Sequence, residues 1–241
     1  MQRRDFLSSA LALAAASSLP AAHGATVSGG QPWAPGTASL PALPKVRQGG
    51  LAFFSQHEFD TAGAIADRFI PADSLSIGGQ EAGCATFIDR QLAGDYGQGA
   101  TLYRLGRFVK GTLEQGTQSA LTPAERWRKG LVELDQYTQA RFGKAFTQLS
   151  GDQQDATLKA FEANTVKVSA AFDDGAKEIF EQWLANVREG FLADPLYGGN
   201  RGMASWKMLG FPGARYDFRD VIAKKGQKLE IIPTSLIDNT L

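Results

Sequence analysis

Histidine and cysteine are the side chains whose scarcity most restricts the chemistry of this protein. The 241-residue sequence contains two histidines, His23 and His57, and one cysteine, Cys84. A zinc site built from His and Cys ligands would need His57 and Cys84 together with carboxylates. Iron–sulfur clusters held by four thiolates and thiolate-anchored haem are excluded by the single cysteine. We therefore expect no metal and no haem in this chain.

Other chemistry-bearing motifs are missing from the sequence. It contains no GxGxxG, no GxxxxGK[ST] and no GxSxG pattern, so neither a nucleotide cradle nor a serine nucleophile is predicted. One catalytic alternative stays open, in which His57 acts as a general acid or base with Glu58 or Asp60 in an independent periplasmic helical enzyme. A ligand-binding bundle without a partner is another alternative. Otherwise the sequence predicts a chain with no cofactor of its own.

The N-terminus has the features of an export signal. Arg3 and Arg4 are followed by Phe6 and Leu7, which matches the twin-arginine pattern, and an Ala/Leu run then extends to Leu19. This run is too short and too rich in alanine to span a bilayer. We expect cleavage after Gly24, with an uncleaved anchor as the alternative, so that residues 1–24 are removed. Residues 25–50 are rich in proline and glycine and predict a flexible tether before a domain over residues 51–241.

The charge balance limits the classes of partner. The sequence has 25 basic and 25 acidic residues, a formal net charge of zero. This balance predicts no binding of nucleic acid and no attraction to an anionic membrane surface. No later apolar run has the length of a transmembrane helix, so membrane association is expected only through partners.

Apolar residues at helical spacing, framed by capping signals, predict an all-α single-domain bundle with an irregular C-terminal docking segment. No strand pattern of useful length precedes residues 229–232. Two patterns are the most informative: Ser55 with Glu58 forms a capping box, and the apolar stripe after Gly175 is sustained over several turns, which makes that helix the central one. The helices are expected over residues 56–70, 81–92, 101–113, 123–142, 151–164 and 176–191.

Cys84 lies on the apolar stripe of the second predicted helix. A cysteine at such a position is usually a small buried hydrophobe. Because an odd cysteine in an exported protein can also pair with another chain, an intersubunit disulfide is the alternative.

Residues 194–216 combine turns, aromatic residues and basic residues directly after the central helix. Aromatic and arginine side chains dominate interface energies, and glycines allow a close backbone approach. A docking role and a purely structural role, in which Trp206 and Phe211 plug the end of the bundle, are both open. The predicted partner-binding residues are Tyr197, Gly198, Gly199, Asn200, Arg201, Trp206, Lys207, Phe211, Pro212 and Gly213.

The string Asp194-Pro195-x-Tyr197-Gly198-Gly199-Asn200-Arg201, continued by Trp206-Lys207-x-x-Gly210-Phe211-Pro212-Gly213, resembles the small (gamma) subunit of the gluconate 2-dehydrogenase family. The resemblance covers roughly residues 55–218 and is most specific between residues 194 and 213.

The resemblance implies a periplasmic complex at the inner membrane. In such complexes a large subunit holds FAD and oxidises the sugar acid, and a multihaem cytochrome c subunit, which carries haem c, passes electrons onward. The small subunit is taken to have no catalytic residues and to support folding, stability and export of the flavoprotein by the twin-arginine translocase. Gluconate is the family's default substrate and is not deduced from these residues.

Overall fold

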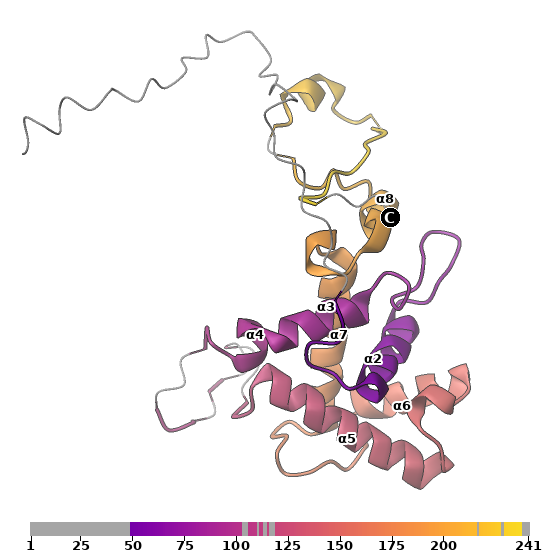
Figure 1. Ribbon diagram of the computed structural model, residues 1–241, viewed down its shortest axis with the longest axis vertical. Coiled ribbons are helices and arrows are strands. Elements are labelled where there is room, and N and C mark those ends of the chain that lie inside the picture. The colour runs from indigo at the N-terminus through magenta and orange to yellow at the C-terminus, as the bar shows by residue number, and fades with distance from the viewer. Residues whose placement is uncertain are drawn as a thin grey trace, which may run out of the picture. The chain divides into compact units, whose positions relative to one another are not determined.

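The computed structural model describes residues 49–102, 106–109, 111–112, 115, 119–215, 217–227 and 229–237. These residues are helical and contain no strand, which confirms the predicted all-α class (Figure 1). One isolated bridge joins Gly213 to Thr234. The predicted export signal, with Arg3, Arg4, Phe6 and Leu7, lies outside the described residues, as does the predicted tether up to residue 48.

The α-helices follow the predicted order except that α4 (Asp95–Gln98) and α8 (Ala204–Leu209) were not predicted and the helix expected over residues 101–113 is absent from the described residues there; α8 lies in the segment that the sequence predicted to be irregular. Short 3-10 turns lie at Phe146–Gln148 (η2), Pro195–Tyr197 (η3), Arg201–Met203 (η4) and Arg219–Lys224 (η5). The α-helices are α2 (Gln56–Phe69), α3 (Cys84–Ala93), α4 (Asp95–Gln98), α5 (Pro123–Phe142), α6 (Gly151–Glu162), α7 (Ala176–Leu192) and α8 (Ala204–Leu209).

The capping residues predicted from the sequence begin three of these helices. Ser55 accepts a hydrogen bond from the main-chain nitrogen of Glu58, whose carboxylate accepts one from the nitrogen of Ser55 at 2.7 Å. Thr122 with Glu125, and Ser150 with Gln153, form the same reciprocal pairs before α5 and α6. Each pair satisfies two main-chain donors that the first helical turn leaves without partners, so these starts are determined locally.

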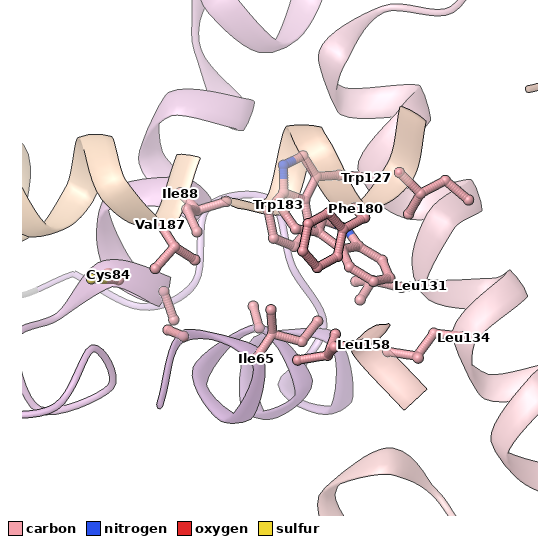
Figure 2. Close-up of a cluster of buried hydrophobic side chains, with 14 of the residues drawn as sticks. Ile65, Cys84, Ile88, Trp127, Leu131, Leu134, Leu158, Phe180, Trp183 and Val187 are labelled. Carbon is pink, nitrogen blue, oxygen red and sulfur yellow. The ribbon is translucent and has the colours of Figure 1, made fainter. Parts of the chain in front are cut away.

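Helix α7 is the central packing element, as predicted. It contacts α2, α3, α5 and α6, and its Trp183 is fully buried. Trp183 lies 5.5 Å from Phe161 of α6 and 6.0 Å from Trp127 of α5, measured between ring centroids. Figure 2 shows Trp183 and Trp127 together with Ile65 of α2 and Ile88 of α3. The apolar stripe of α7 therefore joins four helices into one core.

The helix predicted over residues 101–113 is wrong for the described residues of that range, 101–102, 106–109 and 111–112. These residues adopt turn and coil conformations. Gly106 and Gly111 lie inside the stretch and disfavour helix. Its described large apolar residues, Leu102, Phe108 and Val109, are exposed. The short helix α4 precedes this stretch instead and ends at Gly99, whose φ is +65°.

Helix α3 begins at Cys84, three residues later than predicted. Gly83 before it has a φ of +83°, a left-handed conformation that stops the helix from extending toward Glu81. A Cβ atom at Gly79 would lie 2.5 Å from the main-chain oxygen of Ala66. The glycines of this turn thus allow close packing of the chain on α2. Among the described residues, no helix is long and apolar enough to cross a membrane.

Candidate functional site

The segment after α7 is held in place by Asn200. Its side chain is fully buried, and its φ is +45°. The amide nitrogen donates to the main-chain oxygen of Ala193 at 2.9 Å, and the amide oxygen accepts from the nitrogen and hydroxyl of Ser205 at 3.0 and 2.8 Å. One side chain therefore ties the end of α7 to the start of α8. Asparagine suits this position because it tolerates the left-handed region and can both donate and accept.

Gly198 and Gly199 allow the segment to approach α3 and α7. A Cβ atom at Gly199 would lie 2.0 Å from the main-chain oxygen of Gly190, and one at Gly198 would lie 2.7 Å from a guanidinium nitrogen of Arg90. The sequence suggested that these glycines let the backbone approach another surface. The structure shows that the surface they approach belongs to the chain's own helices.

Trp206 closes the end of the bundle. It is 6% exposed, its Nε1 donates to the main-chain oxygen of Leu192 at 2.9 Å, and its ring meets that of Phe211 edge-on with centroids 5.2 Å apart. Gly213 lies against this ring and against Thr234. The structural role that the sequence left open for Trp206 is the one its contacts show.

Four of the predicted partner-binding residues are exposed: Tyr197, Arg201, Lys207 and Phe211. Arg201 is partly engaged, because its guanidinium donates to the hydroxyl of Thr86 at 3.1 Å and its main-chain nitrogen to the oxygen of Ala82 at 3.0 Å. Pro212 is half-buried and accepts a hydrogen bond from Thr234 through its main-chain oxygen. The segment thus presents one subset of its unusual residues to solvent and uses the others for internal packing.

Tyr197 borders an open groove of about 760 Å³ between α3 and α7. Two of its apolar lining residues, Leu192 and Tyr197, are 45% and 48% exposed. Sequence reasoning missed most of the lining, because the lining residues lie on helices whose other faces form the core. The full lining is Phe87, Gln91, Ala185, Arg188, Glu189, Leu192, Ala193 and Tyr197. We call this surface the α3/α7 groove.

The sequence of residues 56–213 matches the family gluconate 2-dehydrogenase subunit 3. The chain belongs to this family. No curated protein and no solved structure matches the chain. The matched region begins with α2 and ends at Gly213, so in this family member it contains both the helical bundle and the Asp194–Gly213 segment.

In this member of the subunit 3 family, Cys84 is a free cysteine with no exposed surface. Burial raises the pKa of its thiol to about 12, and the carboxylate of Asp67 acts in the same direction. A thiol must be accessible and deprotonated to form a disulfide or bind a metal. In the folded chain Cys84 therefore packs as a hydrophobe, and the alternative of an intersubunit disulfide does not fit its position.

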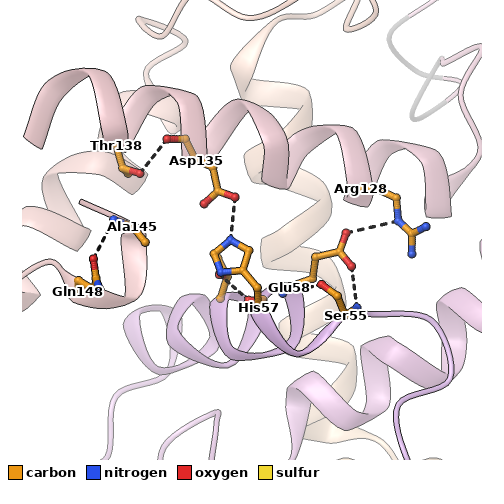
Figure 3. Close-up of polar contacts among 9 residues, drawn as sticks. Ser55, His57, Glu58, Arg128, Asp135, Thr138, Ala145 and Gln148 are labelled. Atoms are coloured by element: carbon orange, nitrogen blue, oxygen red, sulfur yellow. Dashed lines mark hydrogen bonds and ion pairs between the residues drawn. The ribbon is translucent and has the colours of Figure 1, made fainter. Parts of the chain in front are cut away.

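His57 lies in a second, smaller depression of about 490 Å³ between α2 and α5. Its Nε2 lies 2.8 Å from Oδ2 of Asp135, and its side chain is 53% exposed. Neither Glu58 nor Asp60, the partners expected from sequence, makes this contact. Glu58 pairs with Arg128 (Figure 3), and Asp60 accepts a hydrogen bond from Gln56. Sequence reasoning missed Asp135 because it lies 78 positions away. In the described part of the chain, no three His, Cys, Asp or Glu side chains cluster as a metal site would require.

Proposed function

We propose that this chain is the non-catalytic small subunit of a periplasmic, membrane-associated, FAD-dependent gluconate 2-dehydrogenase complex. In this proposal the chain supports folding, stability and twin-arginine export of the flavoprotein subunit. The observation that carries the proposal is the family match over residues 56–213. The family name describes one subunit of a dehydrogenase, so a subunit that performs the oxidation is expected beside it.

The α3/α7 groove is the proposed docking site for the flavoprotein. Leu192 and Tyr197 expose apolar surface beside Phe87, and Arg188 and Glu189 place charges at the same groove. An apolar centre with polar groups around it is the composition of protein interfaces. Exposed apolar side chains gathered in one groove are stabilised when a partner removes them from water.

The proposal places FAD in the large subunit and haem c in the cytochrome subunit. The rare ligand types of this chain agree with that division. Cys84 is buried and has a raised pKa, which opposes its use as a thiolate ligand. His57 is hydrogen-bonded to Asp135 at the surface. Membrane contact, in this proposal, comes through the partners.

The export proposal rests on the sequence Arg3-Arg4 with Phe6 and Leu7. The twin-arginine route exports folded proteins, commonly with a cofactor bound. In this proposal the chain has no cofactor of its own, so its use of this route is explained if it carries a cofactor-bound partner. Replacing Arg3 and Arg4 by lysine is expected to leave both this chain and the flavoprotein in the cytoplasm. Export of the flavoprotein despite this change would overturn the carrier role.

Purification of the tagged chain from its native host tests the proposal as a whole. We expect flavin absorbance, haem absorbance and two further polypeptides to accompany the wild-type chain. Leu192→Asp should reduce the accompanying flavoprotein. Val132→Asp is the matched control, because Val132 is similarly exposed on α5 and does not line the groove. Gluconate oxidation by the purified chain alone would refute a non-catalytic role.

The His57–Asp135 pair favours a second candidate function, that of an independent periplasmic helical enzyme or ligand-binding protein. A histidine oriented by a carboxylate can act as a general base. The hydroxyl groups near His57 in sequence are engaged in other hydrogen bonds. The hydroxyl of Ser55 caps α2, and that of Thr61 donates to the main-chain oxygen of His57 at 2.8 Å. This candidate predicts turnover or ligand binding by the isolated chain that His57→Ala abolishes. If His57→Ala leaves turnover or ligand binding unchanged, this second candidate function has no side chain to perform it.

A further inference from the structure

The chain continues beyond the family-matched region as a loop that closes on itself. The main-chain nitrogen of Ala214 donates to the oxygen of Thr234 at 2.7 Å, and the nitrogen of Thr234 donates to the oxygen of Pro212 at 3.1 Å. Gly213 has a φ of +75°, and a Cβ atom there would lie 2.2 Å from the oxygen of Thr234. Residues 214–233, here called the C-terminal loop, are therefore joined at their base; Figure 1 shows the loop in yellow.

A second set of hydrogen bonds ties the base of the loop to the end of α7. The carboxylate of Asp194 accepts from the hydroxyl of Ser235 at 2.7 Å and from the main-chain nitrogen of Leu236 at 3.1 Å. The same carboxylate accepts from the nitrogen of Leu196 at 2.8 Å. Asp194 thus connects the loop base to η3, the turn that contributes Tyr197 to the α3/α7 groove.

The C-terminal loop exposes large apolar side chains. Ile222 is 71% exposed and Ile232 is 87% exposed, and Phe218 is about half exposed. None of the described residues between 214 and 232 is buried. The apolar side chains of the loop therefore do not contribute to the core of this chain, and their exposure to water costs free energy that a partner surface would recover.

The charges of the loop are partly neutralised within it. Arg215 pairs with Asp220, and Arg219 pairs with Asp217. Lys224 and Lys225 directly follow the apolar residues of η5, are exposed, and have no ion pair among the described residues. Among its described residues, the loop thus offers apolar contact area next to the positive charges of Lys224 and Lys225.

We propose that the C-terminal loop is a second docking element, and that its occupant is an apolar surface bordered by carboxylates on the flavoprotein subunit. This inference rests on the proposed function and adds a contact outside the family-matched region. Carboxylates on the partner complement Lys224 and Lys225. Ile222 would be buried at the centre of the contact, with Phe218 beside it.

Other occupants fit the loop less well. Lipid recognition by charge uses clusters of roughly four to eight basic residues, whereas the five basic residues of this loop are interspersed with Asp217, Asp220 and Glu230, and its two arginines pair with two of these carboxylates. A symmetric contact between two copies of the loop would bring the lysines of both copies together, because a two-fold interface uses the same patch twice. A protein surface of opposite charge avoids both difficulties.

Site-specific photocrosslinking in the native complex tests this inference. Ile222 is replaced by p-benzoylphenylalanine in the tagged chain, the complex is purified from the host and irradiated, and the product is identified by mass. We expect a covalent product with the flavin-binding polypeptide. The same replacement at Val132 is the control and should give none. A product with a second copy of this chain, with lipid alone, or no product at all at position 222 would overturn the inference.

Two variants give an independent measurement on the same complex. Ile222→Asp should weaken retention of the flavoprotein roughly tenfold, as expected for a buried interface side chain. Lys224→Glu with Lys225→Glu should also weaken retention and reduce its dependence on salt, while Lys129→Glu on α5 should change neither. Full retention by both loop variants would contradict a docking role. If the wild-type chain brings no flavoprotein, the proposed function fails; if it does and position 222 does not crosslink, only this inference fails.

Discussion

The indole nitrogen of Trp206 donates a hydrogen bond to the main-chain oxygen of Leu192, the last residue of α7, at 2.9 Å. A helix leaves its last carbonyl oxygens without helical partners, and the indole satisfies one of them while its ring covers the helix end. The most unusual residues of the sequence are thus used first to complete the bundle. The neighbouring side chains that stay exposed are the ones available to a partner.

Trp206→Ala is expected to destabilise the isolated chain by about 3 kcal/mol, because it removes a buried aromatic ring. Trp206→Phe should cost less, since it keeps one aromatic ring and loses the hydrogen bond and part of the buried ring system. Phe211→Ala is the control: its ring is about half exposed. Urea denaturation of the three variants measures these differences. If the Trp206→Ala chain had wild-type stability but impaired assembly, the result would indicate that Trp206 contacts the partner directly.

Asn200→Ala is expected to destabilise the chain by roughly 2 to 3 kcal/mol. It leaves the oxygen of Ala193 and the nitrogen of Ser205 without their partner, and unpaired buried polar groups carry a desolvation penalty. Asn200→Gly keeps the positive φ accessible and isolates the loss of the amide. Thermal melting of both variants checks this. Equal melting temperatures for Asn200→Ala and the wild type would show that these bonds contribute no stability.

The ion pair between Arg68 of α2 and Asp155 of α6 predicts a pH dependence. The two hydrogen bonds, both 2.7 Å, lower the pKa of Asp155. In the unfolded chain this carboxyl has its ordinary pKa and takes up a proton first as the pH falls. The stabilisation is therefore present above a pH of about 4 and is lost as the pH falls through the lowered pKa.

The corresponding variant is Asp155→Asn. At neutral pH it should lose roughly 0.5 to 1 kcal/mol, a modest amount because both side chains are about one-third exposed and solvent screens the pair. The difference from the wild type should disappear in strong acid. Denaturation midpoints at the two pH values measure it. Glu230→Gln, at an exposed carboxyl, is the control, and a difference that persists in acid would argue for another cause.

Cys84 is expected to be unreactive in the folded chain. Its surface is fully buried and its pKa is raised to about 12, so both access and thiolate formation are suppressed at pH 8. A soluble disulfide reagent should modify Cys84 in denaturing urea and not in native buffer. Non-reducing electrophoresis of the purified complex should show no cross-linked chain containing this subunit. Rapid native labelling would restore the intersubunit disulfide as a possibility.

Tyr197→Ala is expected to weaken assembly with the flavoprotein by about 2 kcal/mol if Tyr197 anchors the contact. Folding should change little, because the ring lies at the edge of the α3/α7 groove and is about half exposed. The measurement is the retention of flavin absorbance on the tagged chain, with the unfolding midpoint as the check on stability. Retention equal to that of the wild type would place the contact away from this groove.

Local chemistry in the sequence determined much of the fold. The pairs Ser55–Glu58, Thr122–Glu125 and Ser150–Gln153 predicted the starts of α2, α5 and α6, because a capping box is made by residues three positions apart. The apolar stripe of α7 predicted the central helix, because helical spacing directly encodes which face is buried. The unusual residues from Asp194 to Gly213 indicated the family, and residues 56–213 confirm it.

Only the tertiary structure decided which of those residues face inward. Gly199 and Trp206 contact Gly190 and Leu192 of α7, and a spacing rule cannot show whether a glycine approaches its own chain or another. The partner of His57 is Asp135, far away in sequence, because the crossing of two helices sets that contact. The described residues of the helix expected over 101–113 are not helical, and their apolar side chains are exposed; apolar spacing forms a stable helix only where tertiary packing offers a surface to cover.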